Sequence, residues 1–371
     1  MAILVVGNGF DVAHKLPTKY SHFLQFADFM KEFTGANFED LQRRVKDISF
    51  LNTTNVTQVY NEAIELGWET LFIKENLWAV YFKDKSEIGE NWVDFEEEIS
   101  NSVQAFEFWL QSEKKYKWID RKSVAYSQEA RDIDREFKNT LKKLVSPKLS
   151  LENYKADITK WEIALDKLIS HLEIYLAIVE NHLDDTKKLS FISEKNIEKV
   201  ISFNYTDIYT RIYKPNPSCE VQYIHGKIRS GKERELREND MVVGIEEYLS
   251  ETEKSENLNF IYFKKYFQRI YKKTGTAYKT WVKAKTFGFE GDSRDVYIVG
   301  HSLALTDKDI IKELIENAEK TIIYYFNNDT HRKQISNLIA TITQKTLIEK
   351  VANGTVIFEE QPEKFVDDDI V

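Results

Sequence analysis

The chain opens with an apolar run that ends at two glycines. Residues Ile3 to Val6 are all apolar, and Gly7 and Gly9 follow them directly. An apolar run that stops at glycines is typical of the first buried strand of an α/β sheet. Glycines there permit a tight turn and the close approach of a ligand. The next helix would point its unpaired N–H groups at that turn. The opening stretch therefore predicts a strand, a turn and a helix that suit a phosphate.

From residue 21 to residue 189 the apolar positions follow a helical period. Within Ala156–Leu183, apolar residues recur at steps of three and four, as on one face of a helix. Similar patterns cover Tyr60–Leu66, Trp92–Leu110 and Ala130–Leu144. This part of the chain is expected to be a large all-helical insertion after the first strand.

After residue 189, short strand-like runs, several of them continuously apolar, alternate with helical patterns. The runs are Lys199–Thr206, Val221–Gly226, Met241–Ile245, Asp295–Gly300, Thr321–Phe326 and Thr355–Phe358. The helical patterns are Asn259–Lys283, Lys308–Ala318 and Thr330–Glu349. Continuous apolar runs suit central strands that are covered on both faces. The alternation predicts an α/β fold, a Rossmann-like doubly wound and mainly parallel sheet.

These patterns divide the chain into three parts. Residues 1–20 and 190–360 would form one discontinuous Rossmann-like nucleotide-binding domain, interrupted by the helical insertion at 21–189. Residues 361–371 include the acidic run Asp367–Asp369 and are expected to be a disordered tail.

Composition and charge narrow the function. The formal net charge of −9 speaks against general nucleic-acid binding, although it is compatible with a local basic patch. The single Cys219 excludes an internal disulfide and a cysteine-based zinc site, and no metal is expected. No signal segment and no apolar run of membrane length is present, so we expect a cytoplasmic protein without a membrane partner.

The glycine turn is the first candidate site. Val12 stands where the dinucleotide fingerprint has its third glycine, so the motif is incomplete. Asp11 could bond a ribose or hold the loop, and the whole turn could equally serve packing alone. The candidate binding residues here are Gly7, Asn8, Gly9, Phe10, Asp11 and Thr18.

Polar residues also follow two of the later strands. Asn204 and Asp207 come after the run at Val200, and His225 precedes Gly226. Ligands of open α/β sheets bind outside the carboxyl ends of the strands, and a neutral imidazole there could be a general base. The alternatives are that Asn204 caps a turn, that Thr206 or Asp207 caps the next helix, and that His225 is a structural hydrogen-bonding residue.

The stretch Gly300-His301-Ser302 resembles the nucleophile elbow of a serine hydrolase. That elbow needs a helix directly after the serine. Here the next helix cap lies at Thr306–Asp309, four residues late. We therefore interpret Gly300, His301 and Ser302 as another wall of the same cleft.

Charged residues on two further helices admit two interpretations. Glu96 falls within the apolar face that begins at Trp92, and a buried carboxylate is costly unless it is paired or used. It either forms a salt bridge with a core Arg or Lys, or the insertion lowers it onto the cleft. The basic segment Phe263–Lys273 is expected to have a solvated basic face over an inner stripe of Phe260, Phe263, Phe267 and Ile270.

The order of these motifs resembles that of the AbiH family, bacterial abortive-infection proteins directed against bacteriophage. The motifs are Gly-Asn-Gly-Phe-Asp, Leu-Pro-Thr-x-Tyr, Trp-x-Asp-x-Glu, Phe-Asn-Tyr-Thr-Asp, Ile-His-Gly and Gly-His-Ser-Leu. They extend from Ile3 to Leu303. The resemblance implies antiphage defence, with a phage-derived trigger that the sequence does not identify; a homo-oligomer is compatible with it.

A more distant resemblance to sirtuin-like NAD-binding domains bears on chemistry. The Gly7–Gly9 turn, Pro17, Asn204, His225-Gly226 and Gly300–Ser302 occupy comparable places. Asn8 replaces an alanine, Asp11 has no counterpart, and the zinc-binding cysteines of the deacylases are absent. What this resemblance implies is NAD hydrolysis rather than deacylation.

In that interpretation NAD is the substrate or ligand, and the turn at Gly7 holds its pyrophosphate. Asn204 orients the ribose or the attacking water, His225 is the general base, and Glu96 stabilises an oxocarbenium-like sugar. Two alternatives stay open. One is a non-catalytic nucleotide sensor that activates a partner. The other is a nuclease or RNA-directed toxin, which would need metal ligands or a basic cleft.

Overall fold

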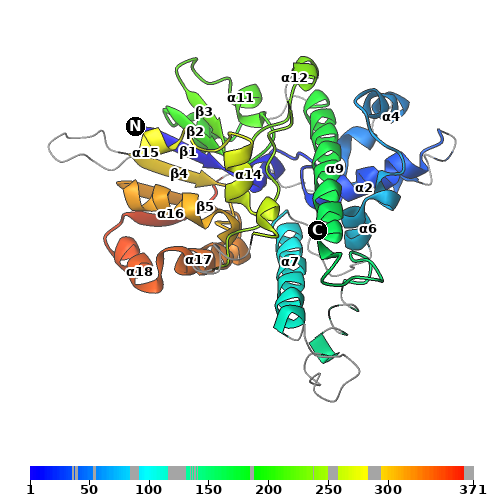
Figure 1. Cartoon of the computed structure of the whole chain (residues 1–371). Coiled ribbons are helices and arrows are strands. Elements are labelled where there is room, and N and C mark those ends of the chain that lie inside the picture. The colour runs from blue at the N-terminus through cyan, green and yellow to red at the C-terminus, as the bar shows by residue number, and fades with distance from the viewer. Residues whose placement is uncertain are drawn as a thin grey trace.

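The computed structural model in Figure 1 describes most of the chain. The described residues are 1–35, 37, 41–52, 56–83, 92–115, 131–133, 135, 137, 139, 141–183, 188–236, 238–249, 258–282 and 294–362. The acidic run Asp367–Asp369 and five residues of the predicted helix Ala130–Leu144 lie outside them.

Six described strands form one parallel sheet. They are β1 (Ala2–Val6), β2 (Lys199–Ser202), β3 (Glu220–Tyr223), β4 (Asp295–Val299), β5 (Lys320–Tyr325) and β6 (Val356–Glu360). Their order is β3-β2-β1-β4-β5-β6, and every neighbouring pair is parallel. This is the strand order of the doubly wound Rossmann fold, so the predicted fold class is confirmed. The direction of winding reverses between β1 and β4, which makes that gap the topological switch point.

The predicted strand at Met241–Ile245 is wrong. The segment is buried, but it lies outside the sheet. The Val242 amide donates to the carbonyl of His225 at 2.8 Å, and the Ile245 amide donates to the carbonyl of Phe263 at 2.8 Å. Its residues are apolar because the segment is buried beside a loop. A short apolar run looks the same in the sequence whether it is such a buried segment or a central strand.

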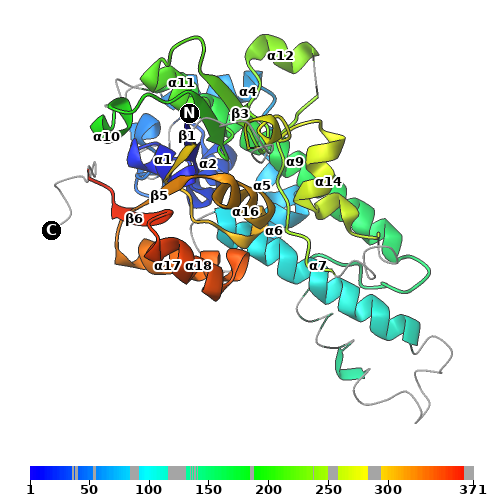
Figure 2. The ribbon, with the colours of Figure 1, turned by 90° about the vertical axis from the view of Figure 1, so that its left-hand side faces the viewer.

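Helices cover both faces of the sheet. One face packs against α15 (Lys279–Val282), α16 (Lys308–Asn317), α17 (Asn328–Ile342) and α18 (Gln344–Ala352). The other packs against α1 (Asn8–Ala13), α10 (Ser190–Ser193) and α11 (Ile208–Tyr213), as Figure 2 shows. Along β1, Ile3 and Val5 join the first core, whereas Leu4 and Val6 join the second. This division follows from the two-residue alternation of a strand, and it explains why the strand sequences are apolar throughout.

Every described element between β1 and β2 is helical. After α1 come α2 (Tyr20–Glu32), η1 (Ser49–Asn52), α4 (Val56–Glu65), α5 (Phe72–Glu75), α6 (Leu77–Lys83), α7 (Trp92–Lys115), α9 (Tyr154–Asn181) and α10. Trp161 of α9 lies at the centre of this part, with ring centroids 5.2 Å from both Trp78 and Phe106. These aromatics belong to the same core as Leu4 and Val6 of β1. The helical part and one sheet face thus share one core, and the division into separate domains stays a prediction.

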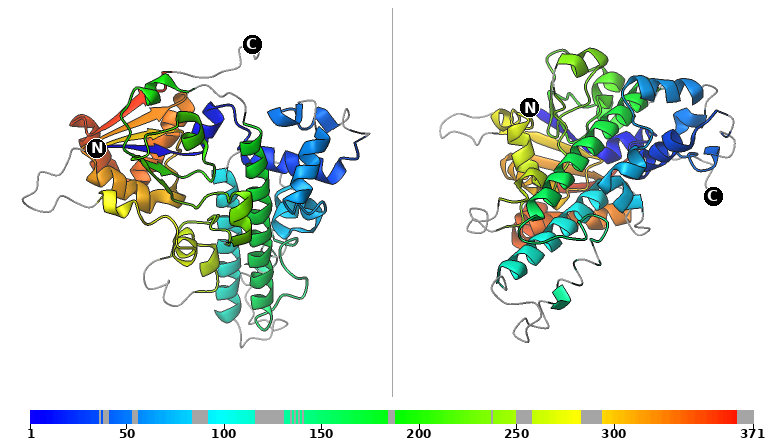
Figure 3. Two further views of the ribbon diagram at one scale, coloured as in Figure 1. Left: turned by 90° about the horizontal axis from the view of Figure 1, so that it is seen from above. Right: turned by 45° about the vertical axis from the view of Figure 1, so that its right-hand side comes forward.

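The carboxyl ends of the strands face the helical part. Figures 1 and 3 show α7 and α9 standing between the sheet and helices α2 and α4. The chain between β3 and β4 adds α12 (Gly231–Leu236), η2 (Ile261–Phe263) and α14 (Lys265–Tyr271), and η3 (Leu305–Asp307) follows β4. Among the described helices, none has the length and apolar character needed to cross a membrane.

Candidate functional site

The glycine turn packs against the loop that follows β4. The Gly9 amide donates to the Gly300 carbonyl at 2.8 Å, and the Gly7 amide donates to Val299 at 3.2 Å. A Cβ on Gly300, whose φ is +65°, would lie 2.0 Å from the Phe10 nitrogen. Only glycine fits this contact at the switch point. The amides of Gly7, Gly9 and Phe10 all donate to backbone carbonyls. Binding of a pyrophosphate at this turn therefore stays a prediction.

Asn8 connects the turn to its exit loop. Its side-chain amide donates to the carbonyl of Thr18 at 3.0 Å and to the Thr18 hydroxyl at 3.1 Å. The structure thus brings both predicted residues together, in a contact that holds the start of α1.

A first polar cluster forms around Asp11, which is only 1% exposed. The Asn204 amide nitrogen donates to Asp11 Oδ1 at 2.8 Å and to the Gly7 carbonyl at 3.0 Å. The Thr206 hydroxyl donates to Asp11 Oδ2 at 2.6 Å. Since these two acceptors occupy both N–H groups of Asn204, the amide oxygen is the atom that this side chain offers to a ligand.

Burial raises the pKa of the Asp11 carboxyl to about 7, although the hydrogen bonds from Thr206 and Asn204 act in the opposite direction. Asp11 therefore changes charge near neutral pH. It holds the loop, which was one of the two roles that the sequence offered for it.

A second polar cluster joins four elements. His225 Nε2 lies 2.9 Å from Asp307 Oδ1, and Lys265 Nζ lies 3.1 Å from the same oxygen. Lys265 Nζ also lies 2.9 Å from Glu96 Oε2 on α7. All four side chains are buried. Of the two interpretations of Glu96, the ion pair with a core lysine is the one that forms.

The charges in this second cluster depend on one another. Burial raises the pKa of Glu96 to about 7, even though Lys265 acts to lower it. Burial also lowers the pKa of His225 to about 4, so its imidazole is neutral at pH 7. Burial alone would raise the pKa of Asp307, but Lys265 and His225 hold it well below its usual range. At pH 7 the cluster therefore contains the ionised Asp307, the Lys265 ammonium group and a Glu96 carboxyl that is only partly ionised.

His301 completes this second cluster. Its Nε2 lies 3.8 Å from Asp307 Oδ2, and its Nδ1 accepts a hydrogen bond from the Leu303 amide at 2.9 Å. Phe203 lies beside both imidazoles, with ring centroids 4.3 Å from His301 and 5.5 Å from His225. Leu303 adopts a φ of +57°, a strained conformation of the kind that occurs near functional sites.

Ser302 does not form a nucleophile elbow. Its carbonyl oxygen accepts a hydrogen bond from Asn337 at 2.9 Å. Its hydroxyl makes no hydrogen bond to an imidazole within the described ranges, and α16 begins only at Lys308. The structure thus agrees with the late helix start that argued against a serine hydrolase.

Asp207 belongs to a different environment. It occupies the N-cap position of α11, where its side chain makes no capping hydrogen bond. Its carboxylate accepts a hydrogen bond from the Tyr223 hydroxyl, and its amide donates to Glu180 of α9. Asp207 therefore links β3 and α9 to the start of α11.

The prediction of a solvated basic face on α14 is wrong. Lys264, Lys265 and Arg269 are buried, whereas Ile270 of the expected inner stripe is 69% exposed. The stripe fails because the helix begins only at Lys265, after the 3-10 turn of η2, which changes the phase of the helical wheel. The buried cations are tolerated because carboxylates compensate them, such as Asp309 for Arg269.

Sequence reasoning missed Lys265, Asp307 and Thr206. Asp307 was interpreted only as part of a helix cap, although it lies next to the candidate loop at Gly300. Its position among Thr306–Asp309 gave no sign that its carboxylate would meet two histidines. A single isolated signal was available for Lys265, a cation within a segment rich in aromatics.

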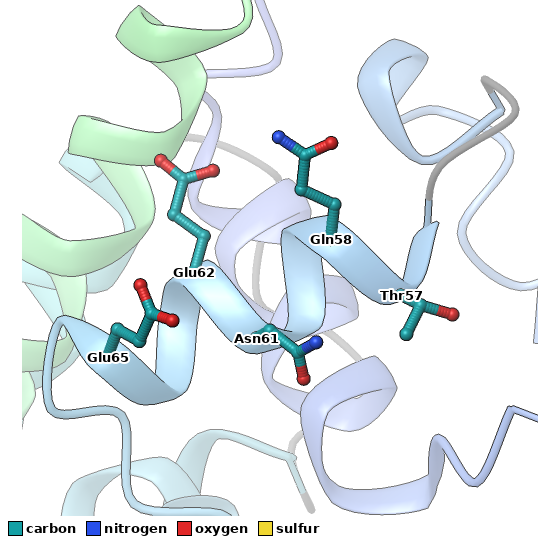
Figure 4. A pocket seen from close by; sticks show the side chains of 5 residues that line it. All are labelled: Thr57, Gln58, Asn61, Glu62 and Glu65. Atoms are coloured by element: carbon teal, nitrogen blue, oxygen red, sulfur yellow. The ribbon is translucent and has the colours of Figure 1, made fainter.

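A surface hollow on α4 lies apart from these clusters. It has a volume of about 470 Å³ and is lined by Thr57, Gln58, Asn61, Glu62 and Glu65. All five side chains come from the same helix, as Figure 4 shows. Figure 1 places α4 across the molecule from the sheet. The described residues contain no group of three or more His, Cys, Asp and Glu side chains that could hold a metal ion.

Comparison with known proteins gives a family match. A family model described as "Bacteriophage abortive infection AbiH" matches residues 3–328, a range that contains both polar clusters. No curated protein and no solved structure matches the chain. The resemblance to sirtuin-like domains therefore stays a prediction.

Proposed function

The chain belongs to the AbiH family of bacteriophage abortive infection proteins, and we propose that it arrests infected cells by hydrolysing NAD at the carboxyl edge of its sheet. In this proposal NAD is the substrate, and the products are nicotinamide and ADP-ribose. Loss of NAD would stop the metabolism on which phage replication depends.

One observation carries the proposal: Asn204 and His225 follow neighbouring parallel strands beside the switch point, and a buried carboxylate holds each of them. Asn204 follows β2 and bonds to Asp11, and His225 follows β3 and bonds to Asp307. Ligands of doubly wound sheets bind at this edge. A polar side chain fixed in this way is pre-organised for chemistry rather than free to rotate.

The chemistry assigned to these residues is cleavage of an N-glycosidic bond. The bond between C1′ of the nicotinamide ribose and the ring nitrogen breaks, and its electron pair leaves with nicotinamide. A water oxygen bonds to C1′, and the proton that the water loses passes to the neutral imidazole of His225. The amide oxygen of Asn204 accepts a hydrogen bond from a ribose hydroxyl or from that water. Glu96 acts on this site through Lys265, because its carboxylate is engaged in the ion pair.

A specific observation favours a second candidate function, a nucleotide sensor that activates a partner. The amides of Gly7, Gly9 and Phe10 are already bonded to carbonyls, and the Asn204 and His225 side chains are nearly enclosed. A nucleotide that binds here would have to rearrange the two loops at the switch point. Such a rearrangement is what a sensor needs to signal occupancy.

The experiment that separates these functions is incubation of the full chain with NAD while nicotinamide and ADP-ribose are followed chromatographically. Hydrolysis predicts release of both products, and Asn204→Ala or His225→Ala abolishes it. His331→Ala is a matched control, since His331 stacks on Tyr325 at the carboxyl end of β5, beyond β4, and belongs to neither polar cluster. It should leave the rate unchanged. Binding of NAD without release supports the sensor. Release at the normal rate by both site variants would overturn the assignment.

A further inference from the structure

One nitrogen of His225 is left without a partner. His225 is 3% exposed, and its Nδ1 has no hydrogen-bond partner among the residues that the structure describes. Buried polar atoms are nearly always hydrogen-bonded, so an exception at a candidate site calls for an explanation. A ligand or water that bonds to Nδ1 would provide one.

The other nitrogen of His225 is bound to an acceptor. Asp307 Oδ1 lies within hydrogen-bond distance of two donors, Nε2 of His225 at 2.9 Å and Nζ of Lys265 at 3.1 Å. Nε2 of His301 lies 3.8 Å from Oδ2. A carboxylate that faces an ammonium group is ionised and can only accept hydrogen bonds. Nε2 of His225 must then carry the proton, which leaves the lone pair on Nδ1.

The contacts of His301 support this assignment independently. Its Nδ1 accepts from the Leu303 amide at 2.9 Å, and a backbone amide can only donate. His301 is therefore also protonated on Nε2, the nitrogen that faces Asp307. Both imidazoles thus direct N–H groups at the same carboxylate.

We propose that Asp307 is a positioning residue that holds His225 as the Nε2–H tautomer, so that Nδ1 is the atom that takes the proton from the attacking water. The second half of this statement rests on the proposed function. The tautomer itself does not, since it follows from the contacts of Asp307 alone. The hydrogen bond made by one ring nitrogen determines the protonation of the other.

Two other histidines of the chain have the opposite tautomer and serve as internal references in a spectrum. His14 Nδ1 lies 2.7 Å from the Phe10 carbonyl, and His171 Nδ1 lies 2.8 Å from the Lys167 carbonyl. Carbonyl oxygens only accept, so these two imidazoles must be Nδ1–H tautomers. His225 and His301 should therefore differ from His14 and His171 within one spectrum.

The test is long-range ¹H–¹⁵N correlation on the full chain labelled at its histidine ring nitrogens, with single His→Gln variants to assign signals. We expect His225 to show a protonated Nε2 and an unprotonated Nδ1, and His14 and His171 to show the reverse. A protonated Nδ1 on His225 in the wild-type chain overturns the proposal.

Two variants of Asp307 test whether this residue determines the tautomer of His225. Asp307→Ala removes the acceptor, so His225 should populate both tautomers. Asp307→Asn should keep the Nε2–H tautomer, because Lys265 draws the amide oxygen into the place of Oδ1. Asp309→Ala, two residues away and paired with Arg269, should change nothing. An unchanged tautomer in Asp307→Ala overturns the positioning role.

Activity provides the second readout. Asp307→Ala should lower kcat for nicotinamide release by about tenfold or more and change KM by less than about twofold. A wild-type chain that releases no nicotinamide refutes the proposed function, while the spectra still decide the tautomer. Nicotinamide release together with a protonated Nδ1 on His225 would leave the function standing and refute the positioning role. The Asp307 side chain makes no capping hydrogen bond to α16. If Asp307→Ala nevertheless fails to fold, the wild-type spectrum alone decides.

Discussion

Glu96 of α7 and Lys265 of α14 form a buried ion pair, with 2.9 Å between Oε2 and Nζ, and the same ammonium group bonds to Asp307. One lysine thus compensates two buried carboxylates, one from the helical part and one from the loop after β4. The pair connects the helices to the carboxyl edge of the sheet.

Removing this ammonium group should destabilise the protein strongly. Lys265→Met leaves Glu96 and Asp307 buried without their counter-charge, which costs about 3–5 kcal/mol. Lys308→Met is the control, because Lys308 pairs with Glu246 at the surface, and its loss should cost about 1 kcal/mol or less. Chemical unfolding followed by circular dichroism measures both. Equal decreases in the free energy of unfolding would show that the buried lysine stabilises the protein no more than the surface lysine does.

Asp11 should make stability fall as the pH rises. Its carboxyl has a pKa of about 7 in the folded chain, against 3.8 ordinarily, so the folded state holds a proton that the unfolded state has lost. The resulting stability is full below about pH 4, is lost progressively up to about pH 7 and is absent above it.

Asp11→Asn should remove this pH dependence. At pH 8 the variant gains at most about 4 kcal/mol relative to wild type, at 1.36 kcal/mol for each pKa unit. Glu96, whose pKa is also raised, contributes a slope of the same sign, whereas the lowered pKa values of His225 and His301 make stability fall toward acid pH. Unfolding free energies at pH 5 and pH 8 provide the comparison. An Asp11→Asn chain with the full wild-type slope would contradict the assignment.

The contact between Asn204 and Asp11 can be tested by exchanging the two side chains. Asn204→Asp puts a second carboxyl group against Asp11, which at pH 8, where Asp11 is ionised, should cost about 3 kcal/mol and abolish the proposed binding of NAD. Asp11→Asn combined with Asn204→Asp restores an amide–carboxylate pair and should recover part of the stability. Recovery stays partial because the new carboxylate faces the Gly7 carbonyl. Thermal unfolding of the two single variants and the double variant measures the coupling. Strictly additive effects would show that the two side chains do not interact.

Gly300 offers a test of the switch-point contact. In Gly300→Ala the added Cβ would lie 2.0 Å from the Phe10 nitrogen, so the two loops must separate. Gly354 is a matched control, since its φ is also positive and nothing lies within 4 Å of its added Cβ. Gly354→Ala should therefore cost only about 1–2 kcal/mol of backbone strain. We expect a distinctly larger loss for Gly300→Ala in the same unfolding assay. Similar losses would mean that the contact is easily displaced.

The sheet was predictable because its strands have a simple signature. Residues 3–6, 200–201 and 296–299 are apolar or aromatic on both faces and are followed by polar or glycine residues, as in parallel strands. The strand order needed the further rule that crossovers are right-handed. Met241–Ile245 misled the same reasoning because an apolar run reports burial and not hydrogen-bond partners.

The candidate site was predictable only in part. Asn204, His225 and Glu96 carried signals of their own, since each is a polar residue at a strand end or on an apolar helix face. Lys265 and Asp307 carried no sign of their partners, because their pairing spans about 40 residues of chain separation and depends on the phase of α14. Local pattern does not encode which buried charges meet.

The core shared by the sheet and the helices limits how the two parts could have been combined during evolution. Val6 of β1 and Trp161 of α9 belong to one continuous set of buried side chains. A helical segment exchanged from an unrelated protein would leave that sheet face without its matching apolar surface. The helices of this chain therefore cannot be exchanged as an independent unit. A chimaera that keeps only the sheet should expose a large apolar face and aggregate.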